Sequence, residues 1–112
     1  MPNPGRVQVA NIFIKNPTTE PAEEGIEEAR KIADSIYQRT IAGEDFAELA
    51  KKHSDDTISG KRGGVLPDFG LGEMILSIEN AAFALKEKGE VSKPVQTHTG
   101  FSIMKLIDKK ES

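Results

Sequence analysis

The stretch from Val7 to Ile14 is mostly apolar and rich in β-branched residues, a composition that predicts a β-strand. Successive side chains of a strand point to opposite faces, and both faces of this stretch carry apolar residues. That pattern indicates a strand buried on both sides. Asn11 is the polar exception, on the face that it would share with Val9 and Phe13.

Helical patterns follow this strand. Apolar side chains spaced by three and four residues in the segment 26–37 predict a long helix from about Pro21 to Ala42. Glutamates crowd the start of that helix, where the helix dipole favours negative charge, and we interpret them as a solvated face. Asp45 resembles the N-cap of a second helix, and a third is expected from about Ile75 to Lys88.

The last third of the chain predicts two strands, Val91 to Thr97 and Phe101 to Ile107, joined by a hairpin turn at His98-Thr99-Gly100. The segment from His53 to Gly72 holds five glycines and is expected to be a loop. Strands and helices do not alternate as in a βαβ series. The predicted fold class is therefore α+β, with helices packed on an antiparallel sheet.

Length and composition fit one domain. We expect it to span residues 7–108, with a linker at 1–6 and a tail at 109–112. The 15 basic and 18 acidic residues give a net charge of −3, which argues against nucleic-acid binding. Without cysteine the chain has no disulfide, no thiolate nucleophile and no Cys-ligated zinc. No apolar run is long enough for membrane insertion, and no signal peptide is apparent.

Known chemical motifs do not match. Gly60-Lys61-Arg62-Gly63-Gly64 lacks the order of a P-loop, and Gly70-Leu71-Gly72 lacks the third glycine of a dinucleotide fingerprint. His53 and His98 have no metal-ligand spacing, so neither a metal nor a cofactor is expected. Ser54-Asp55-Asp56 holds adjacent carboxylates, for which capping of backbone N–H groups is the simplest interpretation. Spacing alone therefore assigns no function.

Collinear blocks of residues along nearly the whole chain resemble the parvulin-type peptidyl-prolyl cis/trans isomerases. Any one block is a weak signal, but eight in the same order are specific. They include Val7–Ile14, Ala42–Ala50, Ser54–Asp56, Gly63–Leu66, Gly72–Met74, Ala81–Leu85, Gly89–Val95 and Gly100–Leu106.

The resemblance implies a parvulin-like fold: a small four-stranded antiparallel sheet surrounded by about four helices, with a short fourth strand near Val65 to Phe69. It also implies an isomerase that rotates Xaa-Pro bonds in peptides or unfolded protein chains. That rotation has a barrier of ~20 kcal/mol but breaks no bond, so it needs neither a nucleophile nor a cofactor.

Site residues follow from the same resemblance. It assigns five residues to substrate binding: Leu66, Phe69, Met74, Ile78 and Thr97. The alternative for the four apolar ones, Leu66, Phe69, Met74 and Ile78, is a purely structural role in the core. It assigns three residues to the catalytic group: Asp56, Asn11 and Ser102. We expect Asn11 and Ser102 on neighbouring strands, facing the same cavity as Asp56.

The chain departs from the family pattern at this centre. Asn11 and Ser102 stand where the family typically has histidines, and Ile78 stands where an aromatic ring is usual. Val65 and Pro67 replace an expected Asp and an expected Gly. Two hypotheses follow: an isomerase of weak activity, or a catalytically silent domain that binds peptides as part of a chaperone.

The expected partners are proline-containing peptides or unfolded chains, with no preference for phosphorylated residues, because the loop after the first strand lacks a basic cluster. The isolated domain is expected to be monomeric. The resemblance favours a periplasmic or other extracytoplasmic location within a multidomain foldase, with the cytoplasm as the alternative.

Overall fold

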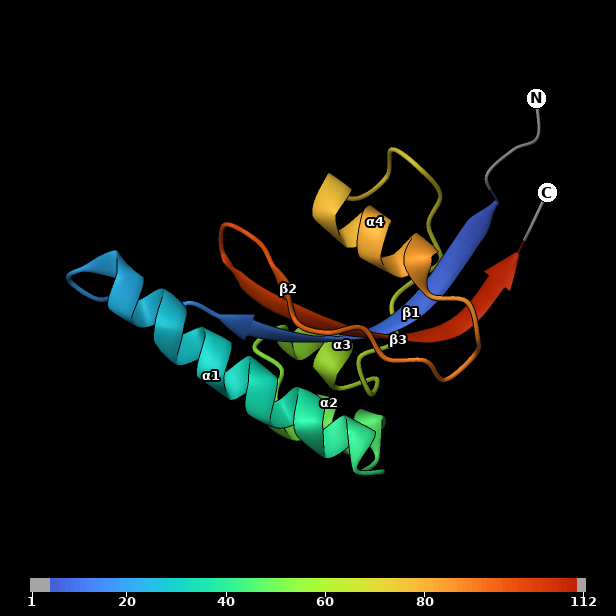
Figure 1. Ribbon diagram of the computed structural model, residues 1–112. Coiled ribbons are helices and arrows are strands. Elements are labelled where there is room, and N and C mark those ends of the chain that lie inside the picture. Colours follow the sequence, from blue (N-terminus) through green and yellow to red (C-terminus); the bar gives the residue numbers. More distant parts are fainter. Residues whose placement is uncertain (1–4, 111–112) are drawn as a thin grey trace.

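The computed structural model describes residues 5–110, which form one sheet with helices on both faces (Figure 1). Residues 1–4 of the expected linker and 111–112 of the expected tail lie outside the described residues. The elements in chain order are β1 (Arg6–Lys15), α1 (Ala22–Ile41), α2 (Phe46–His53), α3 (Thr57–Gly60), α4 (Leu76–Ala84), β2 (Val95–Gln96) and β3 (Gly100–Lys110).

The sheet is antiparallel, with β3 between β1 and β2. β1 and β3 pair along nearly their whole length, with a register shift between Gln8 and Val9. The expected fourth strand is present only as isolated bridges, Val65 to Ala10 and Phe69 to Val7, at the free edge of β1. Pro67 lies between the two bridges and has no N–H to donate to a ladder, which accounts for the broken pairing.

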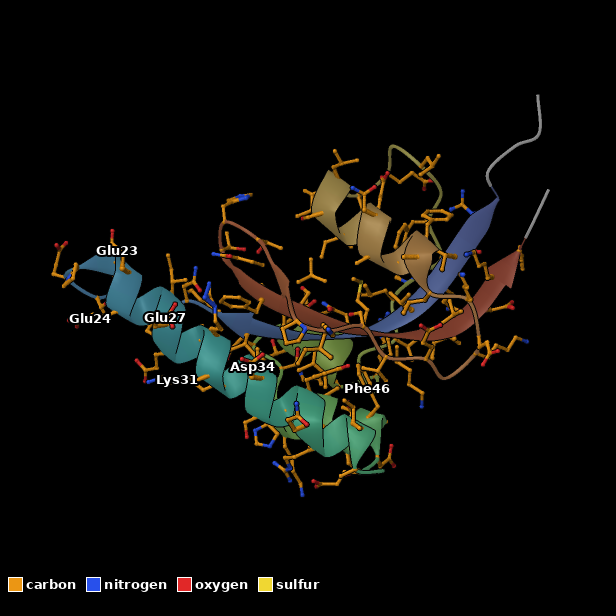
Figure 2. All side chains as sticks on the ribbon, in the orientation of Figure 1. Glu23, Glu24, Glu27, Lys31, Asp34 and Phe46 are labelled. Atoms are coloured by element: carbon orange, nitrogen blue, oxygen red, sulfur yellow. The ribbon has the colours of Figure 1, made fainter. Side chains whose placement is uncertain are left out.

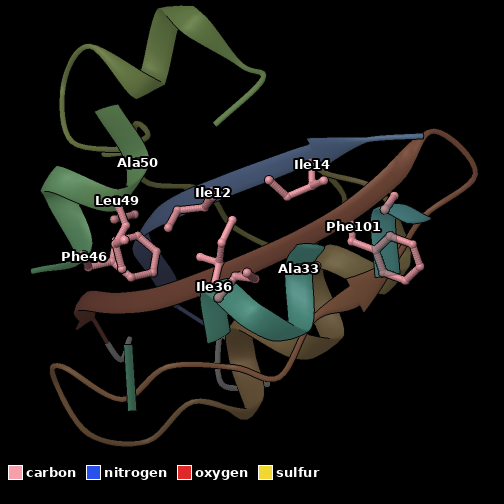
Figure 3. Packing of buried hydrophobic residues seen from close by; sticks show 11 residues of the cluster. Ile12, Ile14, Ala33, Ile36, Phe46, Leu49, Ala50 and Phe101 are labelled. Carbon is pink, nitrogen blue, oxygen red and sulfur yellow. The ribbon is translucent and has the colours of Figure 1, made fainter. Parts of the chain in front are cut away.

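β1 is buried on both faces, as its composition predicts. On one face Ile12, Ile14 and Ile103 pack against α1 and α2, and Figure 3 shows Ile12 and Ile36 in this first core. On the other face Val9, Met104 and Leu106 form a second core with α4 and Phe69. The sheet thus separates two cores.

The helices begin close to the predicted positions. α1 matches the predicted helix to within one residue at each end. Its first turns project beyond the sheet, and Glu23, Glu24 and Glu27 lie exposed there (Figure 2). Asp45 caps α2 by accepting a hydrogen bond from the N–H of Ala47 at 3.0 Å. None of the helices in residues 5–110 is long and apolar enough to cross a membrane.

Several predicted boundaries are wrong. α3 lies inside the segment that was expected to be a loop. α4 stops at Ala84 rather than near Lys88, because the N–H groups of Lys86 and Glu87 are taken up by the carboxylate of Glu90 in a turn. β2 is reduced to two residues, since Pro94 interrupts the ladder just before it.

β3 is longer than predicted and continues to Lys110. The ammonium of Lys109 donates to the backbone carbonyls of Phe83 and Leu85, at 2.8 and 3.0 Å. β3 thus continues through Lys109 and Lys110, which lie in the range expected for the tail.

Candidate functional site

A cavity of about 490 Å³ opens on the α4 side of the sheet. Its size suits a short segment of an extended peptide. Strands supply its floor, the loop before α4 supplies one wall, and the β2–β3 turn supplies another. Its lining residues are Asn11, Phe13, Leu66, Gly72, Glu73, Met74, Ile75, Ile78, Thr97, Thr99, Ser102 and Met104.

Strand register brings Asn11 and Ser102 to this floor together. Phe13 pairs with Ser102, and Asn11 pairs with Met104. Directly paired residues of an antiparallel ladder point to the same face, so all four side chains share the cavity side. The expectation that Asn11 and Ser102 lie on neighbouring strands and face one cavity is confirmed.

The floor carries little polar surface. Ser102 is 3% exposed. The side-chain oxygen of Asn11 is buried and has no hydrogen-bond donor within the described structure. A buried acceptor without a partner costs about 1–3 kcal/mol relative to one that is paired. Asn11 therefore lines the cavity, while its side-chain oxygen is enclosed by the protein without a donor.

Four of the five predicted substrate-binding residues line the cavity: Leu66, Met74, Ile78 and Thr97. Met74 is 40% exposed and Ile78 is buried, so Met74 belongs to the rim and Ile78 to the inner wall. Thr97 also orders the β2–β3 turn, because its hydroxyl accepts from the N–H of Gly100 at 3.2 Å.

Phe69 lies apart from the other four predicted substrate-binding residues, and its role in binding stays a prediction. It is 3% exposed and does not line the main cavity. Its backbone bridge to Val7 turns the ring into the second core, where it meets Phe83 edge to face at 6.4 Å between centroids. Phe69 reaches only a smaller neighbouring cavity of about 220 Å³, which it shares with Leu66 and Met74. It supports the pocket wall from behind.

Asp56 is not among the residues that line the cavity, so the expectation that it faces the same cavity as Asn11 and Ser102 is wrong, whereas its catalytic role stays a prediction. It is the N-cap of α3: its carboxylate accepts from the N–H of Ile58 at 3.2 Å and from the hydroxyl of Ser59 at 2.8 Å. A short polar side chain before a helix satisfies N–H groups that have no partner in the first turn. The capping interpretation of Ser54-Asp55-Asp56 thus holds for Asp56.

The two neighbouring residues bind β1 instead. The hydroxyl of Ser54 accepts from the N–H of Phe13 at 3.0 Å, and the carboxylate of Asp55 accepts from the N–H of Lys15 at 2.8 Å. These bonds hold the edge of β1 beside the cavity. They hold the backbone at Phe13, whose side chain is part of the lining.

Sequence reasoning missed several lining residues. Phe13 and Met104 alternate in step with Asn11 and Ser102, so strand periodicity could have identified them. Periodicity does not mark Glu73 or Ile75 as lining residues, since their loop has no periodic pattern, although Glu73 belongs to the block Gly72–Met74 of the family resemblance.

One ion pair dominates the electrostatics at the mouth of the cavity. The guanidinium of Arg6 donates to the carboxylate of Glu73 at 2.8 and 3.2 Å. This bond, together with one from the N–H of Gly70, holds the pKa of Glu73 below its usual value. Arg6 also contacts Asp68 at 3.2 Å. Because Arg6 partly neutralises it, the one carboxylate in the lining adds little net charge to the mouth of the cavity.

Comparison with known proteins agrees with this geometry. Residues 12–108 match the family model for rotamases, described as the PPIC-type PPIase domain. The chain is 40% identical over 106 residues to foldase protein PrsA 4 of Bacillus cereus, covering 95% of this chain and 33% of the relative. It is 52% identical over 75 residues to a PrsA foldase of Caldanaerobacter subterraneus, covering 67% of this chain and 24% of that one.

Solved structures lead to the same family. A crystal structure of the peptidylprolyl isomerase PrsA from Bacillus cereus superposes with a TM-score of 0.80 at 39% identity, covering 96% of this chain and 36% of that one. The chain thus spans about a third or less of these foldases. It belongs to the PPIC-type, or parvulin, family of peptidyl-prolyl cis/trans isomerase domains.

Proposed function

We propose that the cavity binds a proline of an extended or unfolded chain and lowers the barrier to rotation of its Xaa-Pro bond. The observation that carries this proposal is the shared floor of the cavity. Two polar side chains, Asn11 and Ser102, lie there within a largely apolar lining. Apolar walls suit the proline ring, and a few polar groups suit the backbone on either side of it.

The walls act through solvent exclusion. Resonance makes the peptide bond planar, and the charge-separated form that supports planarity is favoured by water. Leu66, Met74 and Ile78 offer the imide an apolar surface in place of water. Planarity is then less favoured and twisting is easier, without any bond being broken.

Asn11 adds a contact to the substrate backbone. Because Asn11 lines the cavity floor, its side-chain amide can hydrogen-bond to the backbone of a bound peptide. The same contact would orient the chain across β1, and Ser102 is close enough along the floor to bind a neighbouring polar group.

A second candidate function is peptide binding without catalysis. It is supported by the residues at the centre: Asn11 and Ser102 do not titrate near neutral pH, and Asp56 caps α3 instead of facing the cavity. Binding of a peptide in the cavity requires none of these groups to be acidic or basic.

Exchange spectroscopy on a panel of Xaa-Pro peptides, with and without the domain, decides between the two. Faster cis/trans exchange that saturates with peptide supports the isomerase. Saturable binding with unchanged exchange supports the silent module. If no peptide of the panel binds, both are refuted.

Resemblance to PrsA foldases supports a wider setting. We propose that the domain acts outside the cytoplasm as one part of a longer foldase, and that the isolated domain is a monomer. Fractionation of cells expressing the full-length protein tests the location, and light scattering of the isolated domain tests its oligomeric state.

A further inference from the structure

Glu79 is a buried carboxylate that lies outside the cavity lining. It lies on α4 and is 4% exposed, next to Ile78 of the cavity wall. None of the ion pairs within residues 5–110 includes it. Burying a carboxylate is unfavourable unless its oxygens receive hydrogen bonds. A carboxylate kept at this position therefore needs a local partner.

Its partners are two backbone amides of the cavity rim. The N–H of Gly72 and the N–H of Met74 both donate to one oxygen of Glu79, at 2.8 and 2.9 Å. Both residues line the cavity, as do Glu73 between them and Ile75 after them. Glu79 thus binds the rim from inside the protein.

The rim has few other restraints. The segment 71–75 belongs to no helix or strand. Glu73 ties it from outside, through the Arg6 guanidinium and the N–H of Gly70 at 2.7 Å. That outer tie is exposed to solvent, where such pairs contribute little. The inner bonds to Glu79 are shielded from water, so they set the position of Met74.

We propose that Glu79 is a positioning residue: it holds the Gly72–Ile75 rim in the shape that grips the proline-containing segment. This inference rests on the proposed function of the cavity. A rim that is ordered before binding spares the complex the entropy of ordering it. Without Glu79 the rim samples other shapes, and the apparent affinity falls in proportion to the time spent in them.

Two substitutions of Glu79 separate the effect of its hydrogen bonds from the effects of its charge and its volume. In Glu79→Gln the amide oxygen can still accept from both N–H groups, whereas in Glu79→Leu the acceptor is lost and the volume is kept. We expect Glu79→Leu to weaken peptide binding about tenfold. A loss of that size corresponds to a rim that adopts its binding-competent shape only about a tenth of the time. Glu79→Gln should stay within about threefold. Hydrogen exchange at the amides of Gly72 and Met74 should accelerate in the Leu variant alone.

Ser59→Ala is the matched control, because Ser59 is also buried and polar but does not line the cavity. It should leave affinity and the exchange of those two amides unchanged. Should Glu79→Leu fail to fold, Glu79→Asp takes its place, since the shorter side chain cannot reach both amides.

The proposal is overturned if the Leu or Asp variant binds peptide as well as the parent, or if Gln is as damaging as Leu. It is also overturned if exchange rises evenly along the chain. Failure of the proposed function looks different: the parent domain would bind no Xaa-Pro peptide, while the exchange at Gly72 and Met74 would still report whether Glu79 orders the rim.

Discussion

Replacing Asn11 should have opposite effects on the stability of the domain and on peptide binding. In Asn11→Leu a side chain of similar size replaces a buried acceptor that has no donor. Removal of that acceptor should stabilise the free domain by about 1 kcal/mol and weaken peptide affinity about fivefold, through loss of one hydrogen bond. Urea unfolding and a peptide titration measure the two effects. A variant that is stabilised yet binds as tightly as the parent would exclude Asn11 from the substrate contact.

Met74 tests the apolar rim at the same scale. Because it is 40% exposed, Met74→Ala should barely change the melting temperature but should weaken binding of proline peptides several-fold. NMR titration beside a thermal melt measures both.

Two control variants accompany the measurement on Met74→Ala. Ile58→Ala shortens an apolar side chain that is 74% exposed and does not line the cavity, so affinity should not change. Met104→Ala removes a side chain that is 1% exposed and should cost about 2–5 kcal/mol of stability. A large drop in melting temperature for Met74→Ala with unchanged affinity would assign Met74 to the core.

At the scale of elements, the end of β3 supports the end of α4. The last carbonyls of a helix have no partner within it, and the ammonium of Lys109 binds those of Phe83 and Leu85. Lys109→Met keeps most of the aliphatic stem and removes the donor, so it should destabilise the domain by about 1–2 kcal/mol. Chemical denaturation measures this loss. Lys110→Met, at the exposed end of the same strand, is the control, and equal midpoints for the two variants would contradict the capping role.

For the whole molecule, acid sensitivity follows from three carboxylates. The pKa values of Glu73, Glu44 and Glu90 lie below their ordinary 4.5, chiefly because of hydrogen bonds from Arg6, from Arg39 and from the N–H of Lys86 respectively. The folded state therefore takes up protons at lower pH than the unfolded state. Their contribution to stability is complete above about pH 4.5 and is lost as the pH falls through the folded values.

Urea midpoints measured from pH 7 to pH 3 check this expectation. The difference in stability between the parent and a chain carrying Glu73→Gln, Glu44→Gln and Glu90→Gln should be constant at neutral pH and should shrink in the acid range. A difference that grows as the pH falls would show that the sign is wrong.

Local pattern determined much of this protein. The double apolar face of Val7–Ile14, the spacing within 26–37 and the Asp45 cap were enough to predict β1, α1 and the start of α2. Strand alternation also placed Asn11 on the same face of β1 as Val9 and Phe13. These features depend on residues near in sequence or on strict alternation, so they can be inferred without tertiary contacts.

Tertiary structure decided the rest. Phe69 lies outside the main cavity because its backbone forms a bridge to Val7, which is distant in sequence. Asp56 lies outside it because its carboxylate caps α3, a short helix that periodicity does not reveal. Two residues hold the rim. Arg6, which lies 67 residues before Glu73, binds the carboxylate of Glu73, and Glu79, on the helix after the rim, binds the N–H of Gly72. Loop positions set by such partners leave no periodic trace in the sequence, because the physical cause is a contact that exists only once the chain has folded.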